Sequence, residues 1–289
     1  MTTFAFIGFG EAGGLLASGL IASGATVAAT YDLLIDDPAK AAAIQAKAAK
    51  LGITAARSAA EAIAKADIVI AAVVSDQALI AATNVASCIA PGQVYFDINS
   101  TSPMVKQQAA ARIEAKGGAY IDAAVMDLVP PHGHKVPMFL AGKTAARIAP
   151  ILTGFGMKVE AIGEAVGTAS TIKMVRSVFL KGFSAILLES LVAASKVDAQ
   201  EKVLDSLQVT FPQIDWQQMA DYYAVRLVKH AKRQAAEMHE VSETLEHLGL
   251  EPLTALATAK RLEWLADLKL DSAAAVPDSY QTLLRAINS

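Results

Sequence analysis

Three glycines near the beginning of the chain have the spacing of a phosphate-binding turn. Gly8, Gly10 and Gly13 follow an apolar run in the pattern G-x-G-x-x-G, and a helix-like stretch comes directly after them. The first glycine permits a sharp turn off a strand, the second lets backbone approach a pyrophosphate, and the third lets the helix pack on the strand. The N–H groups at the helix start then face the phosphates. The pattern also occurs in ordinary glycine-rich turns, but its context predicts a dinucleotide site formed by Gly8, Phe9, Gly10, Glu11, Ala12 and Gly13.

An acidic residue lies where such a site would hold the adenine ribose. The strand-like run Ala25–Tyr31 ends at Asp32, and the interval from Gly8 is 32 − 8 = 24 residues, close to the roughly 20 expected for a ribose-binding acid. If the strand is shorter, Thr30 takes this position instead. Asp32 would repel a 2′-phosphate, and no arginine follows it in Leu33–Asp37. The sequence therefore predicts an NAD(P) cofactor, with NAD favoured over NADP.

The elements that must position these residues alternate up to about residue 163. Apolar runs separated by alanine-rich stretches predict a parallel sheet covered by helices on both faces, a doubly wound Rossmann fold. The expected strands are Thr3–Gly8, Thr26–Tyr31, Ile68–Val73, Val94–Asp97, Ala119–Ala124, Met138–Ala141 and Lys158–Glu160. The expected helices between them are Pro38–Leu51, Ser58–Lys65, Gln77–Ile89, Pro103–Lys116 and Thr144–Leu152.

Ligands of such a sheet bind at the carboxyl ends of the strands. Polar loops follow the expected strands at Val74–Asp76, Asn99–Ser102 and Asp127–Val136. We therefore expect Val74, Ser75 and Asn99 to contact the cofactor.

After Gly163 the strand pattern stops and a helical pattern begins. The expected helices are Thr168–Ser195, Gln200–Gln208, Trp216–Leu248, Pro252–Leu268 and Ser279–Ile287. The sequence thus predicts a Rossmann domain over residues 1–163 and an all-α substrate and dimerisation domain over residues 164–289, joined by a long helix. Val178–Ala194 is apolar nearly all round, and such a helix must be buried on more than one face. We therefore predict a homodimer through the helical domain.

Composition excludes several other classes of function. The chain has 289 residues, a net charge of −3 and a mean hydropathy of +0.39, so nucleic-acid binding is not expected. One cysteine, Cys88, permits no disulfide within the chain, which suits the cytoplasm. The first residues do not resemble a signal peptide, and the longest clean apolar run, Ile68–Val74, is too short to span a bilayer. We expect no membrane partner.

Four motifs in order along the chain resemble the β-hydroxyacid dehydrogenases, the relatives of 3-hydroxyisobutyrate and 6-phosphogluconate dehydrogenases. They are Phe6–Gly13, Asp97–Pro103, Tyr120–Val125 and Gly163–Lys173. The resemblance spans the whole length and implies that Lys173 is the catalytic lysine. It also implies substrate or nicotinamide contacts from Ser100 and a substrate loop that includes Asp122.

The chemistry around Lys173 agrees with that role. Hydride transfer from an alcohol carbon needs a group that takes the hydroxyl proton. A lysine near the start of an apolar helix can be desolvated, which lowers its pKa. Arg176 and Ser177 follow at i+3 and i+4 on the same face, and Lys181 adds a positive charge. The alternative is a surface lysine whose stem lies along apolar neighbours.

The chain also departs from the family pattern. Arg176 and Ser177 replace the two asparagines that usually follow the lysine, and the substrate loop Asp122–Leu128 lacks the usual proline, serine and glycine pair. Imine reductases share the architecture but usually replace the lysine. Imine or ketimine reduction therefore stays an alternative, as does a non-catalytic dinucleotide sensor.

Further polar residues recur in the predicted substrate domain. His230, Arg233 and Glu237 share one helix face. We predict substrate contacts for Arg176, Ser177, His230 and Arg233, and a surface ion pair for Glu237. His132 and His134 have no carboxylate or cysteine at metal-ligand spacing, so no metal site is predicted. The sequence as a whole predicts an NAD(P)-dependent oxidoreductase that interconverts a hydroxyl and a carbonyl on a small substrate bearing a carboxylate.

Overall fold

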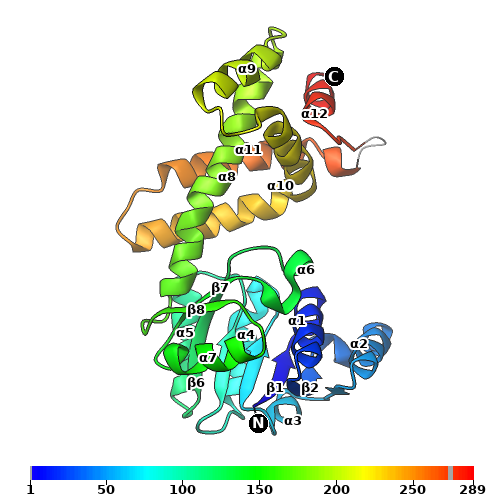
Figure 1. Cartoon of the computed structure of the whole chain (residues 1–289), viewed down its shortest axis with the longest axis vertical. Coiled ribbons are helices and arrows are strands. Elements are labelled where there is room, and N and C mark those ends of the chain that lie inside the picture. Colours follow the sequence, from blue (N-terminus) through cyan, green and yellow to red (C-terminus); the bar gives the residue numbers. More distant parts are fainter. Residues whose placement is uncertain (1, 273–275) are drawn as a thin grey trace. The chain divides into compact units, whose positions relative to one another are not determined.

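The computed structural model describes residues 2–272 and 276–289 and divides the chain into two compact units. The first ends at Lys173 and the second begins at Met174, within helix α8 (Thr168–Ser195) (Figure 1). The predicted boundary, after residue 163, lies before this helix. The first turn of α8 belongs to the first unit because the side chain of Asp122, in the sheet, accepts hydrogen bonds from the backbone N–H groups of Gly167 and Ser170.

The first unit is built on one eight-stranded sheet. Its strands are β1 (Thr3–Ile7), β2 (Thr26–Tyr31), β3 (Thr54–Ala55), β4 (Ile68–Ala71), β5 (Val94–Asp97), β6 (Ala119–Val125), β7 (Met138–Ala141) and β8 (Val159–Gly163). They lie in the order β3-β2-β1-β4-β5-β6-β7-β8, and the reversal of order on either side of β1 is the doubly wound arrangement that the alternating pattern predicts.

Two features of the sheet differ from the prediction. Strand β3 was not expected, because a pair of residues is too short to show a period. Strand β7 pairs antiparallel with β6, whereas all other neighbours are parallel. The segment between them contains only the short helix α6 (Val129–His132) and one 3₁₀ turn, η3 (Gly133–Lys135). A parallel return usually needs a longer crossover helix, so the chain turns back beside β6.

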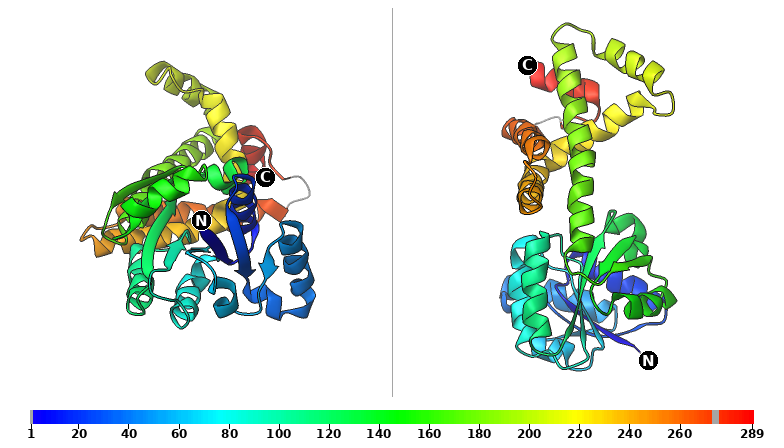
Figure 2. Two further views of the ribbon diagram at one scale, coloured as in Figure 1. Left: turned by 60° about the horizontal axis from the view of Figure 1, so that its bottom comes forward. Right: turned by 90° about the vertical axis from the view of Figure 1, so that its left-hand side faces the viewer.

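Helices cover both faces of the sheet, as the two views of Figure 2 show. They are α1 (Glu11–Ala22), α2 (Pro38–Lys50), α3 (Ala59–Ile63), α4 (Ala78–Ala86), α5 (Pro103–Glu114) and α7 (Ala145–Gly154). Alternate residues of β1 point into the hydrophobic cores on the two faces of the sheet. Phe4 and Phe6 pack with α1 and α7, whereas Ala5 and Ile7 pack with α3 and α4. A strand that is apolar on both sides is what a two-faced parallel sheet requires.

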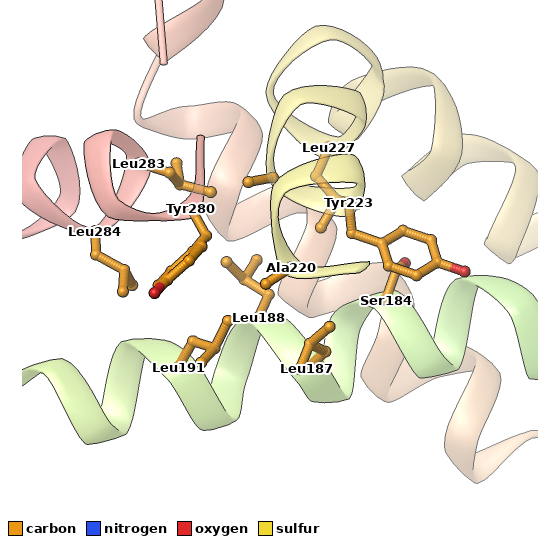
Figure 3. Close-up of a pocket in the computed structure, with 11 residues that line it drawn as sticks. Ser184, Leu187, Leu188, Leu191, Ala220, Tyr223, Leu227, Tyr280, Leu283 and Leu284 are labelled. Carbon is orange, nitrogen blue, oxygen red and sulfur yellow. The ribbon is translucent and has the colours of Figure 1, made fainter. Parts of the chain in front are cut away.

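The second unit is helical. After α8 come α9 (Gln200–Thr210), α10 (Trp216–His247), α11 (Leu253–Asp267) and α12 (Tyr280–Asn288). Figure 3 shows leucines and tyrosines of α8, α10 and α12 pointing toward one another. The space left among them is about 10 Å³, roughly that of one water. This region is therefore a packed core and not a ligand site.

Helix α8 is unusually apolar for its length. Among the described helices it alone is long and apolar enough to cross a membrane, with a mean hydropathy of 1.6 over the best 18-residue window, of which 39% is buried. The core helix of a soluble protein meets the same criterion, so length and composition are weak evidence for a span. Its exposed apolar side chains include Val175, Phe179 and Ile186, spaced along one helical stripe.

Candidate active site

The glycine turn after β1 has the geometry that its three glycines predict. Gly8 has φ +88°, a conformation that side-chain-bearing residues rarely adopt, and a Cβ there would collide with the carbonyl oxygen of Ala72. A Cβ on Gly13 would lie 2.6 Å from the carbonyl oxygen of Gly8, whereas one on Gly10 would meet nothing within 4 Å. Gly8 and Gly13 are therefore needed because backbone atoms pack too closely for a side chain there, whereas Gly10 borders open space at the start of α1.

Asp32 lies directly beside this turn. Strand β2 extends to Tyr31 and Thr30 is fully buried, so Asp32 and not Thr30 occupies the position at the strand end. One oxygen of its carboxylate accepts the N–H of Phe9 at 2.6 Å, and the other accepts the N–H of Leu34 at 2.9 Å. Each carboxylate oxygen has a second lone pair, which stays available to a ligand hydroxyl.

Lys47 is a basic residue at this turn that the sequence did not single out. From α2 its Nζ donates to the carbonyl oxygen of Phe9 at 2.9 Å and to that of Gly10, and it lies 5.0 Å from the centre of the Phe9 ring. Burial lowers the pKa of Lys47, and the charges of Asp32 and Glu11 oppose that shift. A Cβ on Gly14 would collide with Cε and Nζ of Lys47. The contact between Lys47 and the glycine turn forms because α2 packs beside α1, and sequence patterns alone do not show it.

Two other predicted residues meet where β5 ends. Lys173 Nζ lies 2.6 Å from Ser100 Oγ, although 73 positions separate them in the chain. Ser102 caps α5, with its Oγ accepting the N–H of Val105, and Pro103 follows as the first helical residue. Because Ser102 serves as the cap, the hydroxyl of Ser100 is left for Lys173. This pair is an ammonium or amine held beside a hydroxyl, the arrangement needed to pass a proton to a reacting oxygen.

Asn99 is held beneath the same loop. Its Oδ1 accepts the N–H of Val73 at 2.7 Å, and its own N–H donates to Asp97 Oδ1 at 2.9 Å. The amide nitrogen of its side chain is buried and has no hydrogen-bond partner among the described residues. A buried donor without a partner is costly, so a ligand acceptor at this point would satisfy it. Val74 and Ser75, at the neighbouring strand end, are exposed.

Asp122 does not occupy the place predicted for it. Its side chain is fully buried, and Oδ2 accepts hydrogen bonds from the backbone N–H groups of Gly167 and Ser170 and from Ser170 Oγ at 3.0–3.1 Å. The predicted substrate contact is therefore corrected: Asp122 fastens the first turn of α8. The error arose because the motif gives a residue's place on a strand, whereas the face it points to depends on neighbouring elements.

The remaining predicted substrate residues lie in the helical unit. Arg176 and Ser177 follow Lys173 on α8. On α10, His230 lines an open groove of about 450 Å³ together with Tyr222 and Arg226. Burial, then the positive charges of Arg233, Arg226 and Lys229, lower the pKa of His230. The ring is therefore biased toward its neutral form.

Glu237 forms the ion pairs expected of it. It lies 3.0 Å from Arg233 and 2.7 Å from Lys181, so Arg233 already has a carboxylate partner. In the part of the chain that the structure describes, no group of three or more His, Cys, Asp or Glu side chains is arranged to hold a metal ion.

Comparison with known families assigns both parts of the chain. The profile of the NAD binding domain of 6-phosphogluconate dehydrogenase matches residues 3–163, and that of a domain of unknown function (DUF1932) matches residues 194–265. The first match spans the glycine turn, Ser100 and all eight strands of the sheet.

Individual relatives agree with these matches. A conserved hypothetical protein of Sinorhizobium meliloti of known crystal structure is 39% identical, with a TM-score of 0.86 over 99% of this chain and 96% of that one. An uncharacterised 28.5 kDa protein of Methanothermus fervidus is 30% identical over 71% of this chain and 78% of its own length. A probable 3-hydroxyisobutyrate dehydrogenase of Mycobacterium tuberculosis is 28% identical over 68% of this chain and 65% of its own length.

More distant structures share the fold alone. A reductive aminase of Aspergillus terreus, solved with NADPH and ethyl levulinate, is 15% identical, with a TM-score of 0.59 over 100% of this chain and 99% of that one. The architecture therefore occurs with more than one reductive chemistry, and the choice among them depends on the side chains of the site.

Proposed function

The chain belongs to the β-hydroxyacid dehydrogenase family, and from that premise we propose that it is an NAD(P)-dependent oxidoreductase acting on a hydroxyl or carbonyl of a small carboxylate-bearing substrate. The observation that carries the proposal is the 2.6 Å contact between Lys173 Nζ and Ser100 Oγ. It lies beside the strand ends of a sheet whose glycine turn suits a dinucleotide.

The residues of the turn fit the cofactor that the family implies. The open space at Gly10 and the unpartnered amide nitrogen of Asn99 are what a bound dinucleotide would fill and satisfy. Gly8–Gly13, Asp32 and Asn99 would hold it, with Val74 and Ser75 beside them. When bound, the nicotinamide supplies the acceptor or donor of hydride.

Lys173 and Ser100 would handle the transfer of the substrate's hydroxyl proton. In the oxidative direction Lys173, in its neutral form, accepts the proton of the substrate hydroxyl, and in reduction it returns that proton to the oxygen. The Lys173 ammonium donates to Ser100 Oγ, which leaves the Ser100 hydroxyl hydrogen to orient the reacting oxygen.

The carboxylate of the substrate needs a cationic partner. Arg176 or Arg233 would bind it in bidentate fashion, and Ser177 would add a hydroxyl donor. Arg233 would first have to give up part of its pairing with Glu237. His230, biased toward its neutral form, would act as a hydrogen-bond partner and not as a cation.

Two further features of the proposal are the oligomeric state and the cellular location. We propose a homodimer through the helical unit, because Val175, Phe179 and Ile186 of α8 leave an exposed apolar stripe that a second chain would cover. We propose a cytoplasmic location, because the one cysteine, Cys88, is free.

Imine or ketimine reduction is the second candidate. The shared fold of the reductive aminase favours it, and Lys173 opposes it, since that residue suits alcohol chemistry. A non-catalytic sensor of the dinucleotide is a third, motivated by the altered substrate loop.

The test of the main proposal is the variant Lys173→Ala, with the exposed Lys158→Ala as matched control. Nicotinamide absorbance would be followed with a panel of 3-hydroxy acids, keto acids and cyclic imines. Lys173→Ala should lower kcat by about 10²–10⁴, while the Kd for NADH, from its fluorescence, changes by less than about threefold. A variant that keeps more than about a tenth of the wild-type rate would make Lys173 a bystander.

The panel separates the alternatives. Turnover of cyclic imines without turnover of hydroxy acids would replace the main proposal by imine reduction. Tight NADH binding without turnover of any compound would favour the sensor.

A further inference from the structure

A buried lysine lies between two buried carboxylates beneath the Lys173–Ser100 pair. Lys106, on the first turn of α5, is 1% exposed. Its Nζ lies 2.9 Å from Asp97 Oδ1 and 3.7 Å from Asp122 Oδ1, and it donates to the backbone carbonyl of Asp97 at 2.7 Å. The mechanism proposed above uses none of these three charges.

The register of the sheet explains why a cation is needed there. Strands β5 and β6 are parallel, and Asp97 is the direct partner of Asp122. Neighbouring strands are about 4.8 Å apart. Directly paired residues point their side chains to the same face of the sheet. Two buried carboxylates at directly paired positions would repel each other unless a cation lay between them.

Helix α5 itself gains nothing from this lysine. A positive charge in the first turn opposes the helix dipole, and burial of an ammonium carries a large desolvation cost. The position of Lys106 is therefore explained by the two carboxylates and not by the helix that carries it.

Each carboxylate fastens one half of the candidate site. Asp97 Oδ1 accepts the N–H of Asn99, the residue before Ser100, and Asp97 Oδ2 accepts the hydroxyl of Tyr120 at 2.5 Å. Asp122 Oδ2 holds the N–H and hydroxyl of Ser170, one turn before Lys173 on α8. Ser100 and Lys173 thus depend on two carboxylates that share one ammonium.

We propose that Lys106 is a positioning residue: it keeps Asp97 and Asp122 together as acceptors and so holds Ser100 and Lys173 within hydrogen-bond distance. The inference rests on the proposed function, in which those two residues act on the substrate. Because Lys106 is 1% exposed, we assign it no contact with substrate or cofactor.

Removal of the ammonium has a specific expected consequence. In Lys106→Met the two carboxylates face each other without a cation, and the pair should take up a proton. The protonated carboxyl is a poorer acceptor for the backbone groups it holds, so the Lys173–Ser100 contact loosens. A displacement of about 1 Å at a catalytic group lowers the rate by about a hundredfold.

The experiment is a double-mutant cycle with Lys106→Met, Asp97→Asn and both changes together, and with exposed Lys116→Met as control. Asp97→Asn keeps an acceptor oxygen and removes one of the two negative charges. Lys106→Met should lower kcat by about a hundredfold in the wild-type background but by less than about fivefold beside Asp97→Asn, because no second carboxylate then needs a cation. Equal losses in both backgrounds would overturn the inference.

The pH dependence gives a readout that loss of stability alone would not move. The kcat of Lys106→Met should show an additional ionisation that is absent from the wild type and from the double variant. If Lys106→Met does not fold, the comparison of Asp97→Asn with the double variant still applies. A fall of more than about a hundredfold between those two would contradict the shared-cation role.

A measurement without substrate separates this inference from the proposed function. Labelling of Lys173 with formaldehyde and cyanoborohydride, resolved by peptide mass spectrometry, reports its environment directly. A changed labelling rate in Lys106→Met supports the inference even if no hydroxy acid is turned over. An unchanged labelling rate in a folded, NADH-binding variant overturns it, whatever Lys173→Ala does to activity.

Discussion

Gly10 and Gly13 differ by only three positions, yet alanine at each should fail for a different reason. The Cβ of Gly13→Ala would lie 2.6 Å from the carbonyl oxygen of Gly8 and 3.5 Å from the Ala72 side chain. The Cβ of Gly10→Ala would meet no protein atom within 4 Å, and the φ of Gly10, −65°, lies outside the left-handed region that favours glycine.

The expected magnitudes follow from these distances. Ordinary contact begins at 3.4 Å, so Gly13→Ala requires backbone to move, and such overpacking costs about 1–3 kcal/mol. Alanine recovers up to about 1 kcal/mol through its helix propensity. The net loss, between about 0 and 2 kcal/mol, should lower Tm by no more than about 8 °C for a unit of this size. Gly10→Ala should change stability by less than about 0.5 kcal/mol.

Gly10→Ala, which should leave stability almost unchanged, should weaken cofactor binding. The methyl group of Gly10→Ala enters the space assigned to the pyrophosphate, so the Kd for NADH should rise at least about tenfold, or about 1.4 kcal/mol. Thermal unfolding and NADH fluorescence measure both quantities on the same samples. Wild-type affinity in Gly10→Ala would refute the assignment of that space, and a Tm above that of the wild type in Gly13→Ala would refute the close approach of α1 to β1.

Three other predictions test separate features. Burial lowers the pKa of His134, whose Nε2 lies 3.0 Å from Ser23 Oγ. As pH falls below about 6.5, the unfolded chain therefore binds more protons at this histidine than the folded chain does. Between pH 7.5 and 5, the Tm of the wild type should fall relative to that of His134→Gln. Parallel curves of Tm against pH for the two proteins would count against this prediction. Catalytic efficiency should be higher with NAD than with NADP, and Asp32→Ser should narrow the gap; equal efficiencies in the wild type would disprove the preference. Phe179, 72% exposed, should contribute to the dimer, so Phe179→Glu should give a monomer by light scattering; a wild type already monomeric at micromolar concentration would contradict the dimer itself.

Local patterns in the sequence were sufficient for the Rossmann fold, the glycine turn and helix α8, which has the bounds predicted for it. A glycine turn depends on residues within one strand-turn-helix unit, and a helix shows its period along its own length. Family resemblance, and not periodicity, supplied the roles of Lys173 and Ser100.

Tertiary structure alone decided which charges meet. Asp97, Lys106 and Asp122 lie on three elements, and their contact follows from the register between β5 and β6 and from the packing of α5. The same holds for Lys47 at the glycine turn. Sequence shows that a residue is charged and where it lies along its element, but the partner of a buried charge is set by neighbouring elements. Strand pairing and helix packing, which join distant positions, therefore determine whether such a residue binds substrate or supports the site from beneath.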